Sequence, residues 1–339
     1  MKWFSYIFLM LLPLLTVSCF ETDDAVPPYQ LPEDVDTLSL QSSIYQSQLY
    51  FDFSSGSIVS ENLNTEWTLS FECSDTGFRV RLNSSDFWGI APTGSTNLDS
   101  VYTDDPEYDW RQDSSNGHPD STAVGSWVSF DGGVPSYTNE VYLLGRFDGI
   151  SYNLAKKVQF TSVSENAYEF LIADPALSNT DTIEVLKDDQ YNYRQFSLDQ
   201  METVQLEPMK DQWDLLFTQY FTILYTDDGI PTPYNVRGVL LNMNLVEAAL
   251  DTTIHFLDVN YDNAIQHPFS ALQDAIGHDW KSVTVDEASN SAEYKVRPGY
   301  TYIVRDPNGT LFKLRFKSYF NKSGVKGYPS FEFARLDTE

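Results

Sequence analysis

Hydrophobic and polar residues alternate along much of the chain, a pattern typical of β-strands with one buried face. Residues 78–82 alternate strictly, and residues 312–317 do the same with three basic side chains on one face. The sequence Asp-Pro-Asn-Gly at 306–309 separates this second run from residues 300–305. Because proline fixes a turn φ and Asn-Gly tolerates positive φ, this stretch predicts a β-hairpin.

Helix signals are sparse and lie in the second half. Residues 244–250 could form two helical turns. Residues 267–277 could form another, with Pro268 near its start and Gly277 at its end. We therefore expect an all-β fold, rich in antiparallel strands, with a few short helices.

Short aromatic landmarks of the first half recur in the same order in the second half. They pair residues 50–53 with 193–196, 67–71 with 213–217, 124–127 with 276–280 and 157–162 with 313–318. Recurrence of this kind indicates an internal duplication. It predicts two tandem units, residues 45–177 and residues 185–339.

The N-terminus has the order of a secretory signal. Lys2 precedes an apolar run at residues 8–15, and Cys19 follows shortly after it. This run is too short to span a bilayer as a helix. The residues before Cys19 resemble a bacterial lipobox, which implies a signal peptide at 1–19 and a lipidated Cys19. An ordinary secretory signal is the alternative.

Residues 20–44 are rich in acids and prolines, which predicts an extended acidic tether after the lipid anchor. Together these segments predict an outer-membrane lipoprotein, lipid-anchored and exposed at the cell surface. Once Cys19 is lipidated, Cys73 is the only thiol left, so an intramolecular disulfide is excluded.

Composition limits the partners. The chain has 21 Lys and Arg against 49 Asp and Glu, a net charge of −28. Such a charge repels nucleic acid, so no nucleic-acid partner is expected. Aromatic residues make up 15% of the chain, which favours β-structure and binding surfaces.

Several motifs of the second half together resemble the HmuY family. They lie at residues 212–217, 300–306, 313–316 and 327–333. The resemblance covers roughly residues 190–336, and the first half looks like a diverged copy. It implies an all-β outer-membrane lipoprotein that binds haem or a related tetrapyrrole for uptake and passes it to an outer-membrane receptor.

The resemblance also implies axial ligands, a pair of His or a pair of Met, between the Trp-Asp motif and the last hairpin. That interval contains Met243, His255, His267 and His278, which are our candidate haem ligands. None can be aligned individually with a family ligand. A single His of this kind is more often a surface or turn residue than a ligand, although three of the four His fall in this interval. His118 lies in a polar loop and is not a candidate.

Several tyrosines of the same interval, Tyr220, Tyr225, Tyr234 and Tyr261, could stack on a porphyrin, on a sugar or within the sheet. The alternative function is therefore a non-catalytic glycan- or protein-binding surface module without haem.

Catalytic and metal-binding motifs are missing from the sequence. It contains no HExxH, CxxC, GxSxG or Gly-rich phosphate loop, so no enzyme is predicted. The acids between residues 99 and 113 do not have the spacing of a calcium loop and favour a solvated loop.

Overall fold

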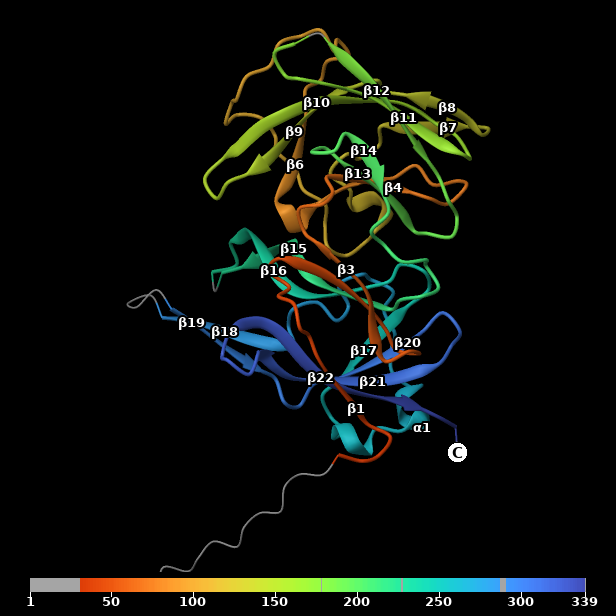
Figure 1. Cartoon of the computed structure of the whole chain (residues 1–339), viewed down its shortest axis with the longest axis vertical. Helices are drawn as coiled ribbons and strands as arrows, with labels where there is room; N and C mark the ends of the chain where they lie inside the picture. Colours follow the sequence, from red (N-terminus) through yellow and green to blue (C-terminus); the bar gives the residue numbers. More distant parts are fainter. Residues whose placement is uncertain (1–30, 178, 227, 287–290, 339) are drawn as a thin grey trace, which may run out of the picture. The chain divides into compact units, whose positions relative to one another are not determined.

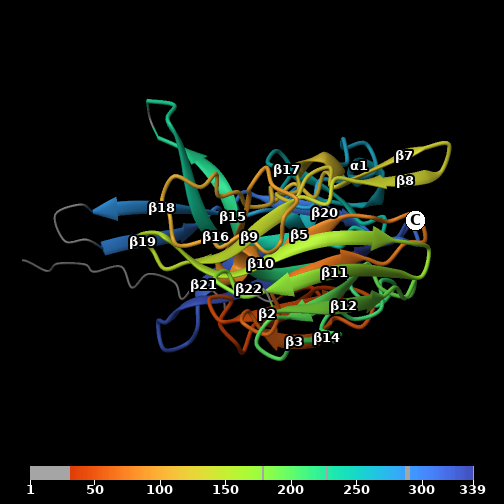
Figure 2. The ribbon, with the colours of Figure 1, turned by 90° about the horizontal axis from the view of Figure 1, so that it is seen from above.

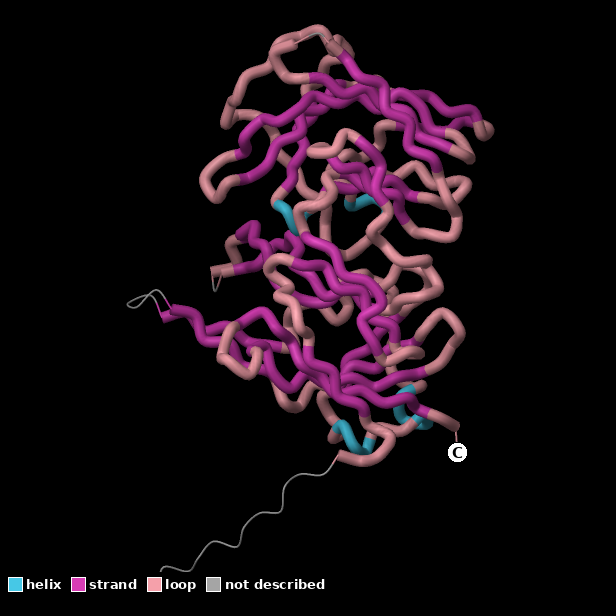
Figure 3. The backbone as a smooth tube through the Cα atoms, viewed as in Figure 1, coloured by secondary structure: helices cyan, strands magenta, loops and turns pink. Residues whose placement is uncertain are grey.

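Antiparallel strands make up most of the described chain (Figures 1 and 3). The computed structural model describes residues 31–177, 179–226, 228–286 and 291–338. Within these ranges the one α-helix is α1 (Tyr261–Ala264), and three single 3₁₀ turns are η1 (Ser84–Asp86), η2 (Pro119–Ser121) and η3 (Phe256–Asp258). The prediction of a β-rich antiparallel fold is confirmed.

Two five-stranded sheets form the outer layers (Figure 1). One has the order β1 (Asp36–Ser39), β22 (Lys326–Leu336), β21 (Leu311–Phe320), β20 (Thr301–Arg305), β17 (Glu247–Asp251). The other has the order β12 (Thr180–Leu186), β11 (Ala167–Ala173), β10 (Tyr152–Val163), β9 (Val141–Phe147), β6 (Trp88–Pro92).

Two four-stranded sheets lie between them. One has the order β14 (Glu202–Val204), β13 (Tyr193–Ser197), β4 (Leu69–Glu72), β5 (Val80–Leu82). The other has the order β16 (Pro231–Leu241), β15 (Leu215–Tyr225), β2 (Ser47–Asp52), β3 (Ser57–Leu63). Two hairpins complete the strands: β7 (Val128–Asp131) with β8 (Val134–Tyr137), and β18 (Lys281–Asp286) with β19 (Ser291–Val296).

The four-stranded sheets join distant parts of the chain. Strand β2 pairs with β15, and β13 pairs with β4. The first hydrophobic core accordingly combines residues 40–53 with residues 215–333, whereas the second lies within residues 69–198. The pairing crosses the expected boundary between residues 177 and 185, and two tandem units are not confirmed.

The same buried hydrogen-bond arrangement nevertheless occurs in both four-stranded sheets. Asn83 Nδ2 donates to the carbonyl of Trp67 (2.7 Å), and Asn242 Nδ2 donates to the carbonyl of Trp213 (2.6 Å). Both Asn side chains are fully buried. Trp67 and Trp213 are also paired landmarks of the sequence, so the duplication stays a prediction with a structural counterpart.

A buried tryptophan packs against a long strand of each core, β10 in one and β21 in the other. Trp127 lies 5.5 Å from Phe160, centroid to centroid, and Trp280 stacks on Phe316 at 4.0 Å. Both indoles are essentially inaccessible to solvent. Large aromatic groups of this kind contribute much of the buried apolar area that holds a sheet pair together.

The two helices expected in the second half are wrong. Glu247–Asp251 is strand β17, paired with β20, because its apolar residues face a sheet neighbour. Residues 267–277 form no helix; Ser270 instead bridges to Ala248 and Gly277 to Val239. Short apolar runs fit both the helical and the strand period, so tertiary pairing decides between them.

The acidic segment is shorter than the expected tether of residues 20–44. Residues 34–339 form one compact unit, and β1 already pairs with β22. Leu40 and Ile44 are buried in the first core. Residues 36–44 are therefore part of the folded body. Cys19 and the expected signal peptide lie outside the described residues.

The hairpin of β15 and β16 is longer than the sheet that carries it. Eleven residues of β15 pair with β16, but only Leu215, Leu216 and Phe217 pair with β2. The far ends of both strands therefore project from the body (Figure 2). This projecting part contributes one wall of the larger cavity described below.

Candidate functional site

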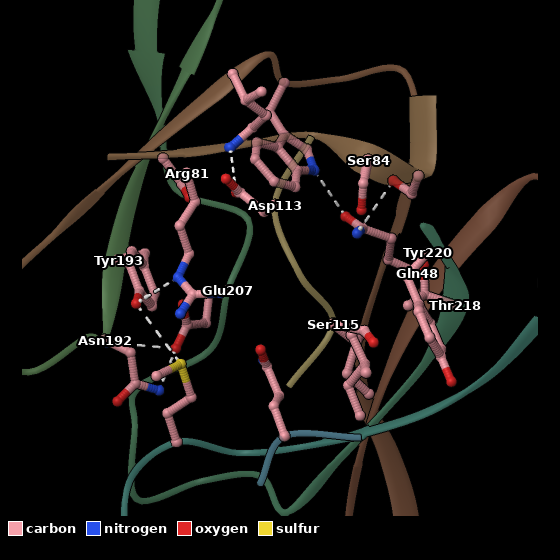
Figure 4. Close-up of a pocket in the computed structure, with 18 of the residues that line it drawn as sticks. Gln48, Arg81, Ser84, Asp113, Ser115, Asn192, Tyr193, Glu207, Thr218 and Tyr220 are labelled. Atoms are coloured by element: carbon pink, nitrogen blue, oxygen red, sulfur yellow. Dashed lines mark hydrogen bonds between the residues drawn. The ribbon is translucent and has the colours of Figure 1, made fainter. Parts of the chain in front are cut away.

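A polar cavity of about 120 Å³ lies where the two four-stranded sheets approach each other (Figure 4). Both sheets contribute to its wall. Polar side chains predominate, and the charged and aromatic members are Arg81, Asp113, Glu207, Tyr50, Trp67, Tyr193, Trp213 and Tyr220.

Hydrogen bonds link the side chains along one wall of the polar cavity. Arg81 Nε donates to the Tyr193 hydroxyl (2.9 Å), and this hydroxyl donates to Met243 Sδ (3.6 Å). Arg81 Nη2 donates to the carbonyl of Gly117 (2.8 Å). These contacts fix the guanidinium at the cavity without a directly bonded carboxylate.

Two buried carboxyl groups border the same space. Burial raises the pKa of Glu207 to about 7, although Asn192 Nδ2 donates to its Oε1 (2.6 Å). Burial also raises the pKa of Asp113, whose two oxygens accept from the amides of Leu82 and Ala123. Both oxygens of Asp113 are thus used by backbone amides. Glu207, in contrast, can change its charge near neutral pH.

The polar cavity is too small for a large ligand. A volume of about 120 Å³ corresponds to about four water molecules at about 30 Å³ each. Drug-sized ligands occupy pockets of roughly 300–1,000 Å³. Water or a small polar molecule fits here, and a tetrapyrrole does not.

A second cavity, the aromatic cleft, has a volume of about 600 Å³. One side comes from the region of η1, β9 and β10, and the other from the projecting part of β15 and β16. Its lining residues are Phe87, Trp110, Gln112, Phe147, Tyr152, Phe221, Pro233, Tyr234, Asn235 and Arg237.

Paired glycines shape the floor of the aromatic cleft. Gly89 of β6 lies directly opposite Gly145 of β9. A Cβ atom at Gly145 would lie 2.5 Å from Trp110 Cη2, and one at Gly89 would overlap Tyr152. Trp110 and Tyr152 therefore pack against the two glycines, which have no side chains. The two rings stack with their centroids 4.5 Å apart and an interplanar angle of 14°.

Arg237 brings the positive charge of the aromatic cleft. Its Nη1 donates to the carbonyl of Asn235 (2.6 Å), and its guanidinium carbon lies 4.2 Å from the ring centroid of Tyr45. Its Nε is buried without a hydrogen-bond partner. Among the described residues no carboxylate forms an ion pair with Arg237.

The candidate haem ligands do not gather in either cavity. Met243 lies at the polar cavity and is 38% exposed. His255 is exposed and caps η3, where its Nδ1 accepts from the amide of Leu257 (3.4 Å). Neither residue lines the aromatic cleft.

The other two histidines contact carboxylates. His267 Nε2 lies 3.2 Å from Oδ2 of the buried Asp251. His278 Nε2 lies 3.6 Å from Asp279 Oδ1, and burial lowers the pKa of this half-buried imidazole. Neither His lines the polar cavity or the aromatic cleft. Their role as ligands stays a prediction.

Sequence reasoning missed most of the aromatic cleft. Of the tyrosines singled out, Tyr234 lines the cleft and Tyr220 lines the polar cavity. Trp110 lies in an acidic loop whose sequence gave no sign of a binding site. Among the described residues, no group of three His, Cys, Asp or Glu is suited to hold a metal ion. The available signal was the pair of glycines, Gly89 and Gly145, inside two strands, because glycine in a strand marks close approach of another group.

Comparison with known families decides the relationship. The model of the HmuY family, described as HmuY protein, matches residues 44–333. The chain belongs to the HmuY family. The HmuY match begins far before residue 190, where sequence reasoning placed it, and so includes the first half. The matched range includes strands β2 and β3, which share a sheet with β15 and β16.

Solved structures give distant matches to this HmuY-family chain. Apo PinO from Porphyromonas gingivitis has a TM-score of 0.27 and 11% identity, with 91% of this chain and 100% of that chain covered. A candidate lipoprotein from Bacteroides fragilis has a TM-score of 0.25 and 10% identity, with 92% and 96% covered. A candidate HmuY-like heme-binding protein from Bacteroides vulgatus has a TM-score of 0.20 and 17% identity, with 43% and 86% covered.

No curated protein matches the chain. Across the part of the HmuY-family chain that the structure describes, none of the helices has both the length and the apolar character needed to cross a membrane.

Proposed function

We propose that this protein captures haem or a related tetrapyrrole in the aromatic cleft and holds it for uptake, without catalysing a reaction. The observation that carries the proposal is the cleft itself, which has about 600 Å³ of space and falls within the usual range for ligand sites. Its stacked Trp110 and Tyr152 suit a flat, largely apolar ring. Membership of the HmuY family supports the same class of ligand.

The protein acts as a lipoprotein at the outer membrane, lipid-anchored through Cys19 and exposed at the cell surface. The apolar run before Cys19 and the acidic residues after it support this location. The compact unit begins at Asp34, which leaves the residues between Cys19 and Asp34 as the tether. An outer-membrane receptor is the expected recipient of the ligand.

Mass spectrometry of the mature protein tests the anchor. The wild-type N-terminus is expected to be an acylated Cys19, and the Cys19→Ser variant is expected to carry no acyl chain. An unmodified wild-type N-terminus would remove the lipoprotein proposal and leave the binding proposal untouched.

A haemin titration of the purified protein tests ligand capture. We expect a shifted Soret band at one equivalent. Tyr234→Ala should weaken binding, because Tyr234 lines the cleft, whereas Tyr225→Ala should not. Tyr225 is a matched control, since both tyrosines are exposed and lie on the same hairpin. An unshifted spectrum, or equal loss in both variants, would count against the proposal.

A glycan- or protein-binding module without haem is the second candidate. It is favoured by the finding that none of Met243, His255, His267 and His278 lines the aromatic cleft. Gln112 and Asn235 also place amides beside the stacked rings, an arrangement that suits sugar hydroxyls. Glycan-array binding by a haem-free sample that disappears in Tyr234→Ala would select this function over tetrapyrrole capture.

A further inference from the structure

We infer that the aromatic cleft recognises the ring face and the carboxylate groups of its ligand and not a bound metal, so that an iron-free porphyrin binds as well as haem does. This inference rests on the proposed function and names the ligand class more closely. It follows from three features: the residue types that line the cleft, the packing of its two tyrosine rings, and the absence of a described carboxylate partner for Arg237.

The lining of the aromatic cleft lacks the usual partners of haem iron. Iron in haem is held by His, Cys or Met, and in some proteins by Tyr. The ten lining residues include no His, Cys or Met. Among the described residues that line the cleft, Tyr152 and Tyr234 are therefore the two of these ligand types.

Tyr152 is held by ring contacts, and its hydroxyl lies next to Gly89, where an added Cβ would be 3.0 Å from the oxygen. The ring lies nearly parallel to Trp110, and Phe147 packs against it at 5.3 Å. Burial raises the pKa of Tyr152 to about 12, which makes the phenolate that ferric iron binds harder to form than in a free tyrosine. Tyr234 stands at the rim with 52% of its surface exposed. Stacking is the interaction that both rings can supply.

Arg237 supplies the counterpart for a carboxylate. It is the one cationic residue among those lining the cleft, in a chain with 49 acids and 21 Lys and Arg. No described carboxylate pairs with it, and its Nε is buried without a partner. A planar guanidinium binds carboxylates through two parallel hydrogen bonds, so a carboxylate on the ligand satisfies this group.

The position of Arg237 is set independently of any ligand. The bond from Nη1 to the Asn235 carbonyl and the stacking over Tyr45 hold the guanidinium in one place. Asn235 Nδ2 in turn donates to the carbonyl of Ser84 (2.8 Å), which ties β16 to η1 across the cleft. The charge is thus fixed before the ligand arrives, and this lowers the entropic cost of binding.

Binding of three porphyrins to the purified protein tests the inference. Haemin and iron-free protoporphyrin should bind with dissociation constants within about threefold of each other, because stacking and ion pairing do not involve the metal. The dimethyl ester of protoporphyrin, which lacks free carboxylates, should bind at least about tenfold more weakly. Quenching of tryptophan fluorescence serves for all three ligands.

Variants supply a second, independent readout. Arg237→Gln should lose the preference for protoporphyrin over its ester, whereas Arg297→Gln should keep it. Arg297 is a suitable control because it is exposed and stacks on Tyr300 outside the cleft. Tyr234→Phe should bind haemin as the wild type does, since only the ring is used. Because the ester needs no substitution, the test does not depend on Arg237→Gln being stable.

The outcomes separate the two levels of the argument. If none of the porphyrins binds, the proposed function fails. A second outcome is that haemin binds, iron-free protoporphyrin binds more than about thirtyfold more weakly, and Ala at Met243, His255, His267 or His278 abolishes haemin binding. The inference and the location in the aromatic cleft then fail, whereas haem capture stands. If the ester binds as tightly as the free acid, the role of Arg237 is overturned.

Discussion

Replacing Glu207 by Gln should make the protein more stable at alkaline pH. Glu207 borders the polar cavity and is 6% exposed, and its nearest partner is the amide of Asn192. No cation forms an ion pair with it among the described residues. A buried carboxylate without a cation is costly, and a neutral amide of the same shape removes that cost while keeping the bond from Asn192.

The size of the effect follows from proton linkage. Burial raises the pKa of Glu207 from its ordinary value of 4.5 to about 7 in the folded state. Below pH 4.5 both the folded and the unfolded states are protonated, so the carboxyl group costs nothing. As the pH rises from 4.5 to about 7, only the unfolded state ionises and the free energy of unfolding falls. Above about pH 7 the loss is complete at about 3 kcal/mol, since one pKa unit corresponds to about 1.36 kcal/mol.

Urea unfolding at pH 4 and pH 8, followed by tryptophan fluorescence, measures this difference. Glu207→Gln should match the wild type at pH 4 and exceed its free energy of unfolding by about 3 kcal/mol at pH 8. Glu202→Gln is the matched control, because Glu202 is exposed on β14 and should change neither value. Equal stability of Glu207→Gln and wild type at pH 8 would refute the reasoning and would mean that water in the polar cavity solvates the carboxylate.

Two further predictions concern packing. Gly145→Ala should cost about 1–3 kcal/mol and weaken ligand binding, because its Cβ would displace Trp110; Gly299→Ala, with nothing within 4 Å, is the control in a thermal melt. Unchanged binding in Gly145→Ala would contradict the role given to the stacked rings. Asn83→Ala and Asn242→Ala should each cost about 1–3 kcal/mol in urea unfolding, and a large cost for one with none for the other would argue against their equivalence.

Strand positions were predictable where the local pattern was strong. Residues 312–317 lie in β21, and Asp306 closes the predicted turn by accepting from the amides of Asn308 and Thr310. Gly309 takes a φ of +82°, as the Asn-Gly signal requires. Here alternation and turn chemistry act over a few residues, so the sequence alone is sufficient.

Pairing between distant strands was not predictable in the same way. The aromatic landmarks at residues 50–53 and 213–217 were recognised as similar, but nothing local states that β2 pairs with β15 and not with β4. Register and partner choice depend on which surfaces remain to be covered, a property of the whole fold. The predicted separation of the halves therefore missed that each four-stranded sheet takes strands from both sides of the boundary.

The same non-local origin explains why the sequence did not indicate the aromatic cleft. Metal-binding side chains are recognised in a sequence by residue type, so the sequence indicated the His and Met residues of one interval as candidate ligands. The aromatic cleft is lined on one side by Trp110 and Tyr152, which lie against Gly89 and Gly145, and on the other by the β15–β16 hairpin. None of these residue types indicates a site alone. The pairing of β6 with β9 places the two glycines opposite each other, where together they leave room for the two rings. In this sheet protein, the two paired strand glycines are therefore the sequence feature that accompanies the stacked rings of Trp110 and Tyr152.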